Sequence, residues 1–243
     1  MRCNCVLCEP GFRDLRNDEK DEQSKERYGY VNQKRNYQKE MEAKLEEFAR
    51  EGRVPKLLLH SCCAPCSSYV LEYLTEHFEI CDFFYNPNIS PAEEYQKRVD
   101  ELRRLVEEMP KSHSIKVLEG AYEPERFFEM AKGMEDLPEG GERCFACYEL
   151  RLREAAKAAA EVGCDFFTTT LTISPLKNAV KLNEIGEKMG EIYGVPYLVS
   201  DFKKKNGFKR STELSREYGL YRQNYCGCVF SKREAMEREK GKA

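Results

Sequence analysis

Three cysteines lie within five residues in the segment LLLHSCCAPCSSYV, which begins at Leu57. They are Cys62, Cys63 and Cys66, and they follow an apolar stretch and precede an apolar-periodic one. We expect Cys66 near a helix N-terminus, where the helix dipole favours the thiolate form. Cys63 and Cys66 also form the CxxC spacing of a thioredoxin-like redox site. Such a site needs only two thiols, whereas an iron–sulfur cluster has a use for more.

A second cysteine pair lies in the segment GERCFACYELRL. Cys144 and Cys147 are three residues apart in the expected opening turn of a helix, so their sulfurs share one face. A buried pair in an apolar core is the alternative, because free cysteine packs as a small hydrophobic residue. The charged neighbours Glu142 and Arg143 make a purely apolar role less attractive.

A third pair, Cys226 and Cys228, forms a CxC in the segment YRQNYCGCVFSKREA. A disulfide across this spacing would be strained and readily reduced, which suits a catalytic redox pair. The alternative is that the two thiols give two ligands to one metal.

Cys62, Cys63, Cys144 and Cys147 together supply four thiolates, the usual complement of a [4Fe–4S] cluster. Tetrahedral zinc would also accept four sulfurs. Zinc sites usually use CxxC knuckles, and adjacent cysteines fit a knuckle poorly. The pattern therefore favours a cluster over zinc.

The elements around these cysteines alternate between strand and helix from residue 56 onward. The expected strands are 56–60, 80–86, 114–120, 164–173 and 196–202, and the expected helices are 67–77, 90–109, 124–134, 143–163 and 176–194. This alternation predicts an α/β protein with a Rossmann-like, doubly wound, mostly parallel sheet and helices on both faces. Ligands of such sheets bind at the carboxyl ends of the strands, where the first cysteine motif falls.

The chain divides into residues 1–53 and 54–243. The first part is a charged N-terminal extension with an expected amphipathic helix at 37–51, and the second is the Rossmann-like catalytic domain. The extension carries Cys3, Cys5 and Cys8. These bind a second metal in one interpretation and belong to an accessory extension in the other.

The bulk composition narrows the classes of protein. The chain has 243 residues and a formal net charge of −3, so it is not a generic polyanion binder as a whole. It lacks an apolar run of about 18 residues and an apolar signal segment, so we expect a cytoplasmic protein with no membrane association. Its twelve cysteines then indicate metal or redox chemistry rather than a disulfide scaffold.

Five motifs between Lys56 and Ala235 give the chain a family resemblance. They are LLLHSCCAPCSSYVLEYL, FFYNPNISPAEEYQKRVDELRRL, RCFACYELRL, TTTLTISPLKN and SREYGLYRQNYCGCVFSKREA. In this order they resemble the QueH-type epoxyqueuosine reductases. The resemblance implies cobalamin-independent reduction of the epoxide of epoxyqueuosine, at the wobble position of certain tRNAs, to the cyclopentene of queuosine. It also implies tRNA as partner and a [4Fe–4S] cluster on Cys62, Cys63, Cys144 and Cys147. Cys226 and Cys228 would form a redox-active disulfide.

Other residues complete the expected site. An external electron donor is needed, Tyr221 or Lys177 would supply a proton, and Cys66 is a ligand of an additional iron or a spare thiol. The expected substrate- and RNA-binding residues are Asn86, Tyr95, Arg98, Ser174, Lys203, Lys204, Lys205 and Arg222. The alternatives are a surface ion pair for Glu94 and Arg98 and a solvated loop for the basic stretch 203–210. His60 is a candidate for a satisfied core histidine.

Two other functions remain open from the residues alone. A cluster-bearing tRNA thiolation enzyme would need a glycine-containing phosphate loop after the first strand, and SCCAPCSS has no glycine. A zinc-stabilised RNA-binding module would need no catalysis, and the identity of the metal would distinguish it.

Overall fold

The computed structural model describes residues 35–240, and Cys3, Cys5 and Cys8 lie outside this range. The strands are β1 (Lys56–Ser61), β2 (Glu79–Phe84), β3 (Ile115–Glu119) and β4 (Phe166–Thr169). The helices are α1 (Tyr37–Glu51), α2 (Ala64–Leu74), α3 (Ala92–Glu108), α4 (Pro124–Ala131), α5 (Glu142–Glu161), α6 (Ala179–Tyr193), α7 (Gly207–Glu217) and α8 (Val229–Lys240), with a 3₁₀ helix η1 (Thr170–Ile173).

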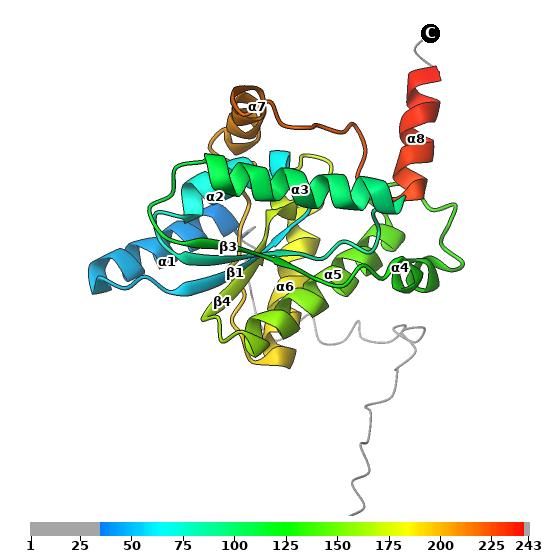
Figure 1. The fold of residues 1–243 in the computed structure, drawn as a ribbon. Helices are drawn as coiled ribbons and strands as arrows, with labels where there is room; N and C mark the ends of the chain where they lie inside the picture. The colour runs from blue at the N-terminus through cyan, green and yellow to red at the C-terminus, as the bar shows by residue number, and fades with distance from the viewer. Residues whose placement is uncertain (1–34, 241–243) are drawn as a thin grey trace, which may run out of the picture. The chain divides into compact units, whose positions relative to one another are not determined.

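The four strands form one parallel sheet in the order β3-β2-β1-β4 (Figure 1). Side chains alternate across a strand. In β1, Leu57 and Leu59 accordingly pack in the core cluster that also holds residues of α1, α2 and α3. Leu58 packs in the opposite cluster with residues of α5 and α6. The predicted doubly wound α/β fold with helices on both faces is confirmed.

The lead-in helix predicted at 37–51 is α1. Its apolar face buries Met41, Leu45 and Phe48 in the same core as Leu57 and Leu59. The helix ends at Gly52, which adopts a left-handed conformation and bonds back to the Ala49 and Phe48 carbonyls. The contacts group the chain from Asn36 onward into one compact unit. Helix α1 therefore packs with the domain that we expected to begin at residue 54.

The fifth predicted strand, 196–202, is wrong. Only Tyr197 forms an isolated parallel bridge, to Phe167 of β4. Beyond it, the Ser200 backbone bonds through both its N–H and its carbonyl to the side chain of Asn183 on α6. A helix side chain thus satisfies the backbone groups that a strand would have paired.

The fourth predicted strand, 164–173, is only partly right. It ends at Thr169, whose side-chain oxygen accepts the Leu171 backbone N–H and starts the 3₁₀ helix η1. Helices α7 and α8 were not predicted. No helix among the described residues is long and apolar enough to cross a membrane.

Candidate metal and redox site

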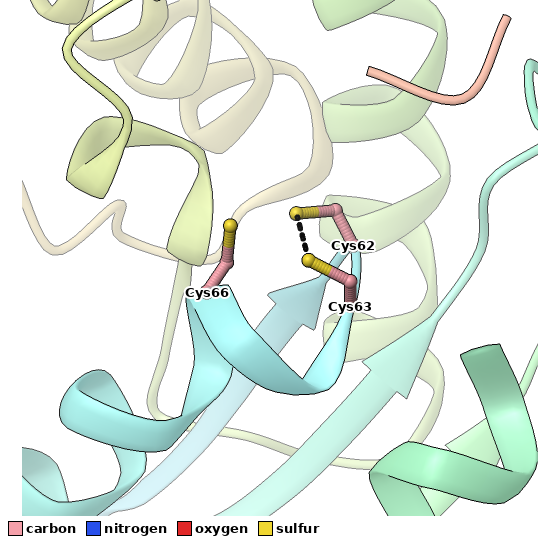
Figure 2. Close-up of side chains that lie close together, drawn as sticks. All are labelled: Cys62, Cys63 and Cys66. Carbon is pink, nitrogen blue, oxygen red and sulfur yellow. Dashed lines mark hydrogen bonds between the residues drawn. The ribbon is translucent and has the colours of Figure 1, made fainter. Parts of the chain in front are cut away.

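Three thiols converge where β1 passes into α2. Ser61 ends the strand, the extended Cys63 caps the helix, and Pro65 occupies its first turn, where a backbone N–H would lack a partner. The sulfurs of Cys62, Cys63 and Cys66 all lie within 4.8 Å of one another. Figure 2 shows the three side chains with their sulfur atoms turned toward one another. The Cys62 and Cys63 sulfurs are 3.9 Å apart. Three sulfurs at one point suit a thiophilic metal.

The three thiols differ in how readily they lose a proton, and the thiolate form is favoured at Cys62. Hydrogen bonds from Cys63 and Cys66 hold the pKa of Cys62 well below its usual value, and the positive charges of Lys177 and Arg151 add to this. Because Cys63 is the partner of that thiolate, its own pKa rises to about 12. The pKa of Cys66 is raised for the same reason. These shifts favour the thiolate form at Cys62 over Cys63 and Cys66, and a metal that binds the three sulfurs would displace their protons.

A second group of cysteines lies beside the first turn of α5. Cys144, Cys147, Cys226 and Cys228 line a small cavity of about 20 Å³. Burial raises the pKa of Cys147 to about 12 and also raises the pKa values of Cys144 and Cys228. All four are free cysteines in this structure. Burial therefore favours the protonated thiol at Cys144, Cys147 and Cys228, and a bound metal would displace these protons.

The two groups adjoin at the carboxyl edge of the sheet. A larger cavity, of about 210 Å³, is lined by Cys62, Cys63, Cys66 and Cys226. Cys226 lines both cavities, as does Lys177. The structure therefore brings all the predicted cysteine motifs to one place. It groups Cys66 with Cys62 and Cys63, whereas the predicted cluster set takes two ligands from each group and stays a prediction.

Two cations act on both groups of cysteines. Burial opposes the charge of Lys177, but Cys226, Cys62 and Cys66 outweigh it and raise the pKa of Lys177. Arg151 is 1% exposed, and its charge acts on both Cys147 and Cys62. Both side chains are therefore positive at neutral pH and compensate for thiolate charge. Arg151 was missed in the sequence, although its position one helical turn after Cys147 was a usable signal.

Asn86 and His60 support the edge of the sheet. The Asn86 side-chain amide donates to the Ser61 carbonyl at 2.8 Å, and its oxygen accepts from Arg151. His60 lies within hydrogen-bond distance of Thr169 Oγ1 and the Tyr85 carbonyl. Burial and the nearby Arg151 lower the pKa of His60 to about 3. His60 is therefore a neutral, satisfied core histidine.

Helix α3 holds the irregular segment that carries Cys226. Arg98 Nη1 donates to the Cys226 carbonyl at 3.2 Å, and Arg98 Nε donates to Glu94 Oε1 at 2.8 Å. The Tyr221 hydroxyl donates to the other Glu94 oxygen at 3.0 Å. Glu101 accepts the Tyr221 backbone N–H at 2.7 Å. Arg98 and Tyr221 are therefore engaged in contacts that fix this segment.

The glycine between the two CxC cysteines fits against the same helix. Gly227 has a φ of +118°, which disfavours other residues. A Cβ there would come within 3.0 Å of Arg98 Nη1 and of Ile89 Cγ1. The Gly227 carbonyl accepts the Ser90 backbone N–H at 3.1 Å. The CxC spacing thus needs glycine for its close approach to α3.

Of the remaining residues predicted to bind substrate or RNA, some line the larger cavity and others lie elsewhere. Ser174 and Arg222 line the larger cavity. Tyr95 is buried, and its hydroxyl donates to the Gly120 carbonyl at 3.2 Å. In the basic stretch, Lys203 pairs with Asp201, Lys205 pairs with Glu42, and Lys204 is exposed. Sequence reasoning missed Phe208, Ser211 and Glu139, which also line the larger cavity.

Asp82 is a buried carboxyl group in the middle of β2. Both of its oxygens are buried, and the neighbouring Ser61 hydroxyl only partly offsets the effect of burial on its pKa. Burial raises the pKa of Asp82 to about 7, so the folded protein keeps this group protonated in mild acid. The unfolded chain ionises the same group above about pH 4. Stability should therefore fall as the pH rises from about 4 to about 7.

The Asp82→Asn variant isolates this effect. Between pH 5 and 7 the wild type should lose about 2–3 kcal/mol of unfolding free energy relative to the variant. Urea unfolding of both proteins across this range measures the difference. His60, with its lowered pKa, contributes the opposite slope in both proteins and cancels. If the unfolding free energies of the two proteins changed with pH in the same way, Asp82 would be ionised in the folded wild type over this pH range.

A family profile described as "Epoxyqueuosine reductase QueH" matches residues 57–234 of the chain. The chain belongs to the QueH family. It is 48% identical over 204 residues to the epoxyqueuosine reductase QueH of Staphylococcus epidermidis, covering 82% of this chain and 86% of that one. It is 39% identical over 188 residues to the QueH of Thermotoga maritima, covering 75% and 93% of the two chains.

A third QueH, from Streptococcus pyogenes, is 43% identical over 202 residues, with 82% of this chain and 79% of that one covered. The expected resemblance is therefore confirmed, and the chain is an enzyme of the oxidoreductase class. The matched region includes every cysteine of both groups. Neither the thiolation enzyme nor the zinc module finds support in these matches.

Proposed function

We propose that the chain reduces epoxyqueuosine to queuosine in tRNA, with an iron–sulfur cluster and the Cys226/Cys228 pair as its redox groups. The observation that carries this proposal is the meeting of both cysteine groups at one edge of the sheet, with Lys177 and Cys226 lining both cavities. Deoxygenation of an epoxide needs two electrons and two protons at one place. Thiols and a buried ammonium group supply these.

The residues present fit a sulfur-ligated cluster. Their donor atoms are soft, the ligand cysteines are buried or half-buried, and the cations Lys177, Arg151 and Arg98 surround them. A cluster with four thiolate ligands is anionic, so these cations would stabilise it. Cys62, Cys63, Cys144 and Cys147 would hold the [4Fe–4S] cluster, and Cys66 would help to hold an additional iron.

When bound, such a metal centre supplies electrons and polarises the epoxide oxygen as a Lewis acid. The Cys226 and Cys228 thiols supply two electrons and two protons by forming one disulfide. The epoxide gains these and becomes an alkene and one water, so the step balances. An external electron donor then restores the dithiol. Electrons pass through the cluster, the dithiol or both.

Lys177 is the better candidate for the proton donor. It lines both cavities, so its ammonium group lies near both cysteine groups. Burial and the hydrogen bond to Glu94 raise the pKa of Tyr221. The Tyr221 hydroxyl, however, already donates to that carboxylate. We assign to Lys177 the delivery of a proton to the epoxide oxygen, with a thiol of the Cys226/Cys228 pair returning that proton to Lys177. We assign a positioning role to Tyr221.

The substrate is a tRNA whose modified wobble base is turned out of its stack into the larger cavity. Ser174 and Arg222 lie on the lining of this cavity, where they would meet the nucleoside. The cytoplasmic location and the lack of membrane association stay predictions.

Nucleoside analysis of a treated tRNA tests the proposal. Anaerobically purified protein is incubated with epoxyqueuosine-containing tRNA and a chemical reductant. The tRNA is then digested to nucleosides, which are separated and identified by mass spectrometry. We expect epoxyqueuosine to lose one oxygen and become queuosine. The Cys164→Ser variant, whose substitution lies outside both cavities, is purified and assayed in the same way and should be as active as the wild type. Unchanged epoxyqueuosine with protein that holds its full complement of iron would reject the function.

A further inference from the structure

The unpredicted helix α7 forms one wall of the larger cavity, through Phe208 and Ser211. Its first residue, Gly207, is closely packed. A Cβ at Gly207 would lie 1.9 Å from the Phe202 carbonyl oxygen and 2.4 Å from the ring of Tyr69 on α2. Only glycine fits this contact, which places the start of α7 beside α2 (Figure 1). The next residue, Phe208, is thereby held at the cavity.

Phe208 and Arg222 form a cation–π pair at this wall of the larger cavity. The Arg222 guanidinium carbon lies 5.5 Å from the centre of the Phe208 ring. Arg222 Nη1 donates to Ser215 Oγ of α7 at 3.2 Å, which restrains the guanidinium group. Phe208 nevertheless remains 39% exposed. An aromatic ring and a guanidinium plane are the groups on which proteins stack unpaired bases.

The lining of the larger cavity combines two kinds of chemistry. Phe208, Ser211 and Arg222 offer stacking surface and polar groups, whereas Cys62, Cys66 and Cys226 offer the redox chemistry. Lys204 and Lys209, which are close to Phe208 in the chain, are exposed. Their charge suits the phosphates that flank a nucleoside. A ligand with a planar heterocycle and a reactive appendage matches this combination.

We infer that Phe208 and Arg222 are the stacking platform for the heterocycle of the modified nucleoside. The platform holds the base so that its epoxide-bearing ring reaches the cysteines. This inference rests on the proposed function and deepens it, because it names the part of the substrate that is read. The base next to the modified one offers the same stacking chemistry, and the experiment separates the two sources.

The test compares the Phe208→Ala and Phe208→Tyr variants with wild type. Phe128→Ala is the matched control, because Phe128 is a 46% exposed phenylalanine on α4 that lines neither cavity. Loss of one base stack is worth about 1–3 kcal/mol. We therefore expect Phe208→Ala to lower kcat/KM for epoxyqueuosine-tRNA by about 5- to 150-fold, mainly through KM. Phe208→Tyr should recover most of the loss, and the control should match wild type.

Binding measured without turnover keeps the two proposals separate. Fluorescence anisotropy gives the Kd of labelled epoxyqueuosine-tRNA, and competition gives the Kd of the free epoxyqueuosine nucleoside. We expect Phe208→Ala to weaken both. Weakened tRNA binding with unchanged nucleoside binding would assign the platform to a neighbouring base and overturn the inference, as would Phe208→Ala values within twofold of wild type. Wild-type protein that binds both ligands but never reduces them would reject the proposed function alone.

Discussion

Replacing Cys226 with serine is expected to stop epoxyqueuosine reduction while the protein keeps its metal. Cys226 lines both cavities and stands beside a second thiol, so it is the residue best placed to pass electrons to a bound substrate. A serine hydroxyl forms no disulfide, and the two-electron step loses its dithiol. We expect turnover to fall by at least about 100-fold, as for the loss of a group that acts in the chemical step.

Single-turnover reduction of epoxyqueuosine-tRNA, with iron and sulfide measured on the same sample, checks this expectation. Cys81→Ser is the matched control, since Cys81 is a half-buried cysteine that lines neither cavity. Full activity in Cys226→Ser would remove the dithiol from the mechanism and leave the electrons to the metal centre. Loss of iron in Cys226→Ser would instead make Cys226 a metal ligand.

The second large effect is expected from Arg98→Ala. Arg98 is 2% exposed, is held by Glu94, and donates to the Cys226 carbonyl. Its guanidinium carbon also lies 5.6 Å from the centre of the Tyr225 ring. Removal of this side chain frees the segment that carries the CxC pair and leaves Glu94 with the Tyr221 hydroxyl as its remaining partner. We expect turnover to fall by about 10- to 100-fold, because small misplacements of reacting groups carry such losses.

A second readout separates positioning from general destabilisation. The Cys226 thiol of Arg98→Ala should react faster with an alkylating reagent, by at least severalfold, while the variant keeps its iron and stays folded at the assay temperature. Arg103→Ala is the control from the same helix, because Arg103 makes an exposed ion pair with Glu119. Alkylation and turnover at wild-type values in Arg98→Ala would show that the segment keeps its place without Arg98.

The alternating strand and helix pattern predicted the fold because its apolar residues follow the periods of a two-sided sheet. Leu57, Leu58 and Leu59 are all buried, since both faces of β1 are covered. The same signal misled at residues 196–202, where Tyr197 and Leu198 are buried but the pairing with β4 is a single bridge at Tyr197. Whether Ser200 pairs with a strand or with the Asn183 side chain depends on a contact that is distant in the chain.

The cysteine motifs were predictable because metal ligands and redox thiols have recognisable spacings. The rule that strand ends carry the sites of parallel sheets placed the first motif at the carboxyl edge of the sheet. The rule did not place the other two motifs there, because neither of them follows a strand. The roles of polar residues did not follow, because composition does not reveal hydrogen-bond partners. Asn86 had the expected location, yet it is fully buried and bonded to Ser61 and Arg151. The importance of Phe208 depends on Gly207 packing against Tyr69, which no local pattern shows.

The content of iron, zinc and acid-labile sulfide in anaerobically purified protein tests the central claim most directly. A cysteine-bound [4Fe–4S] cluster predicts about four irons and four sulfides per chain, with a spectrum that bleaches on reduction. One further iron, lost selectively in Cys66→Ser, would fit the additional site. Zinc without sulfide, even after anaerobic reconstitution with iron and sulfide, would contradict the reductase mechanism proposed for this chain.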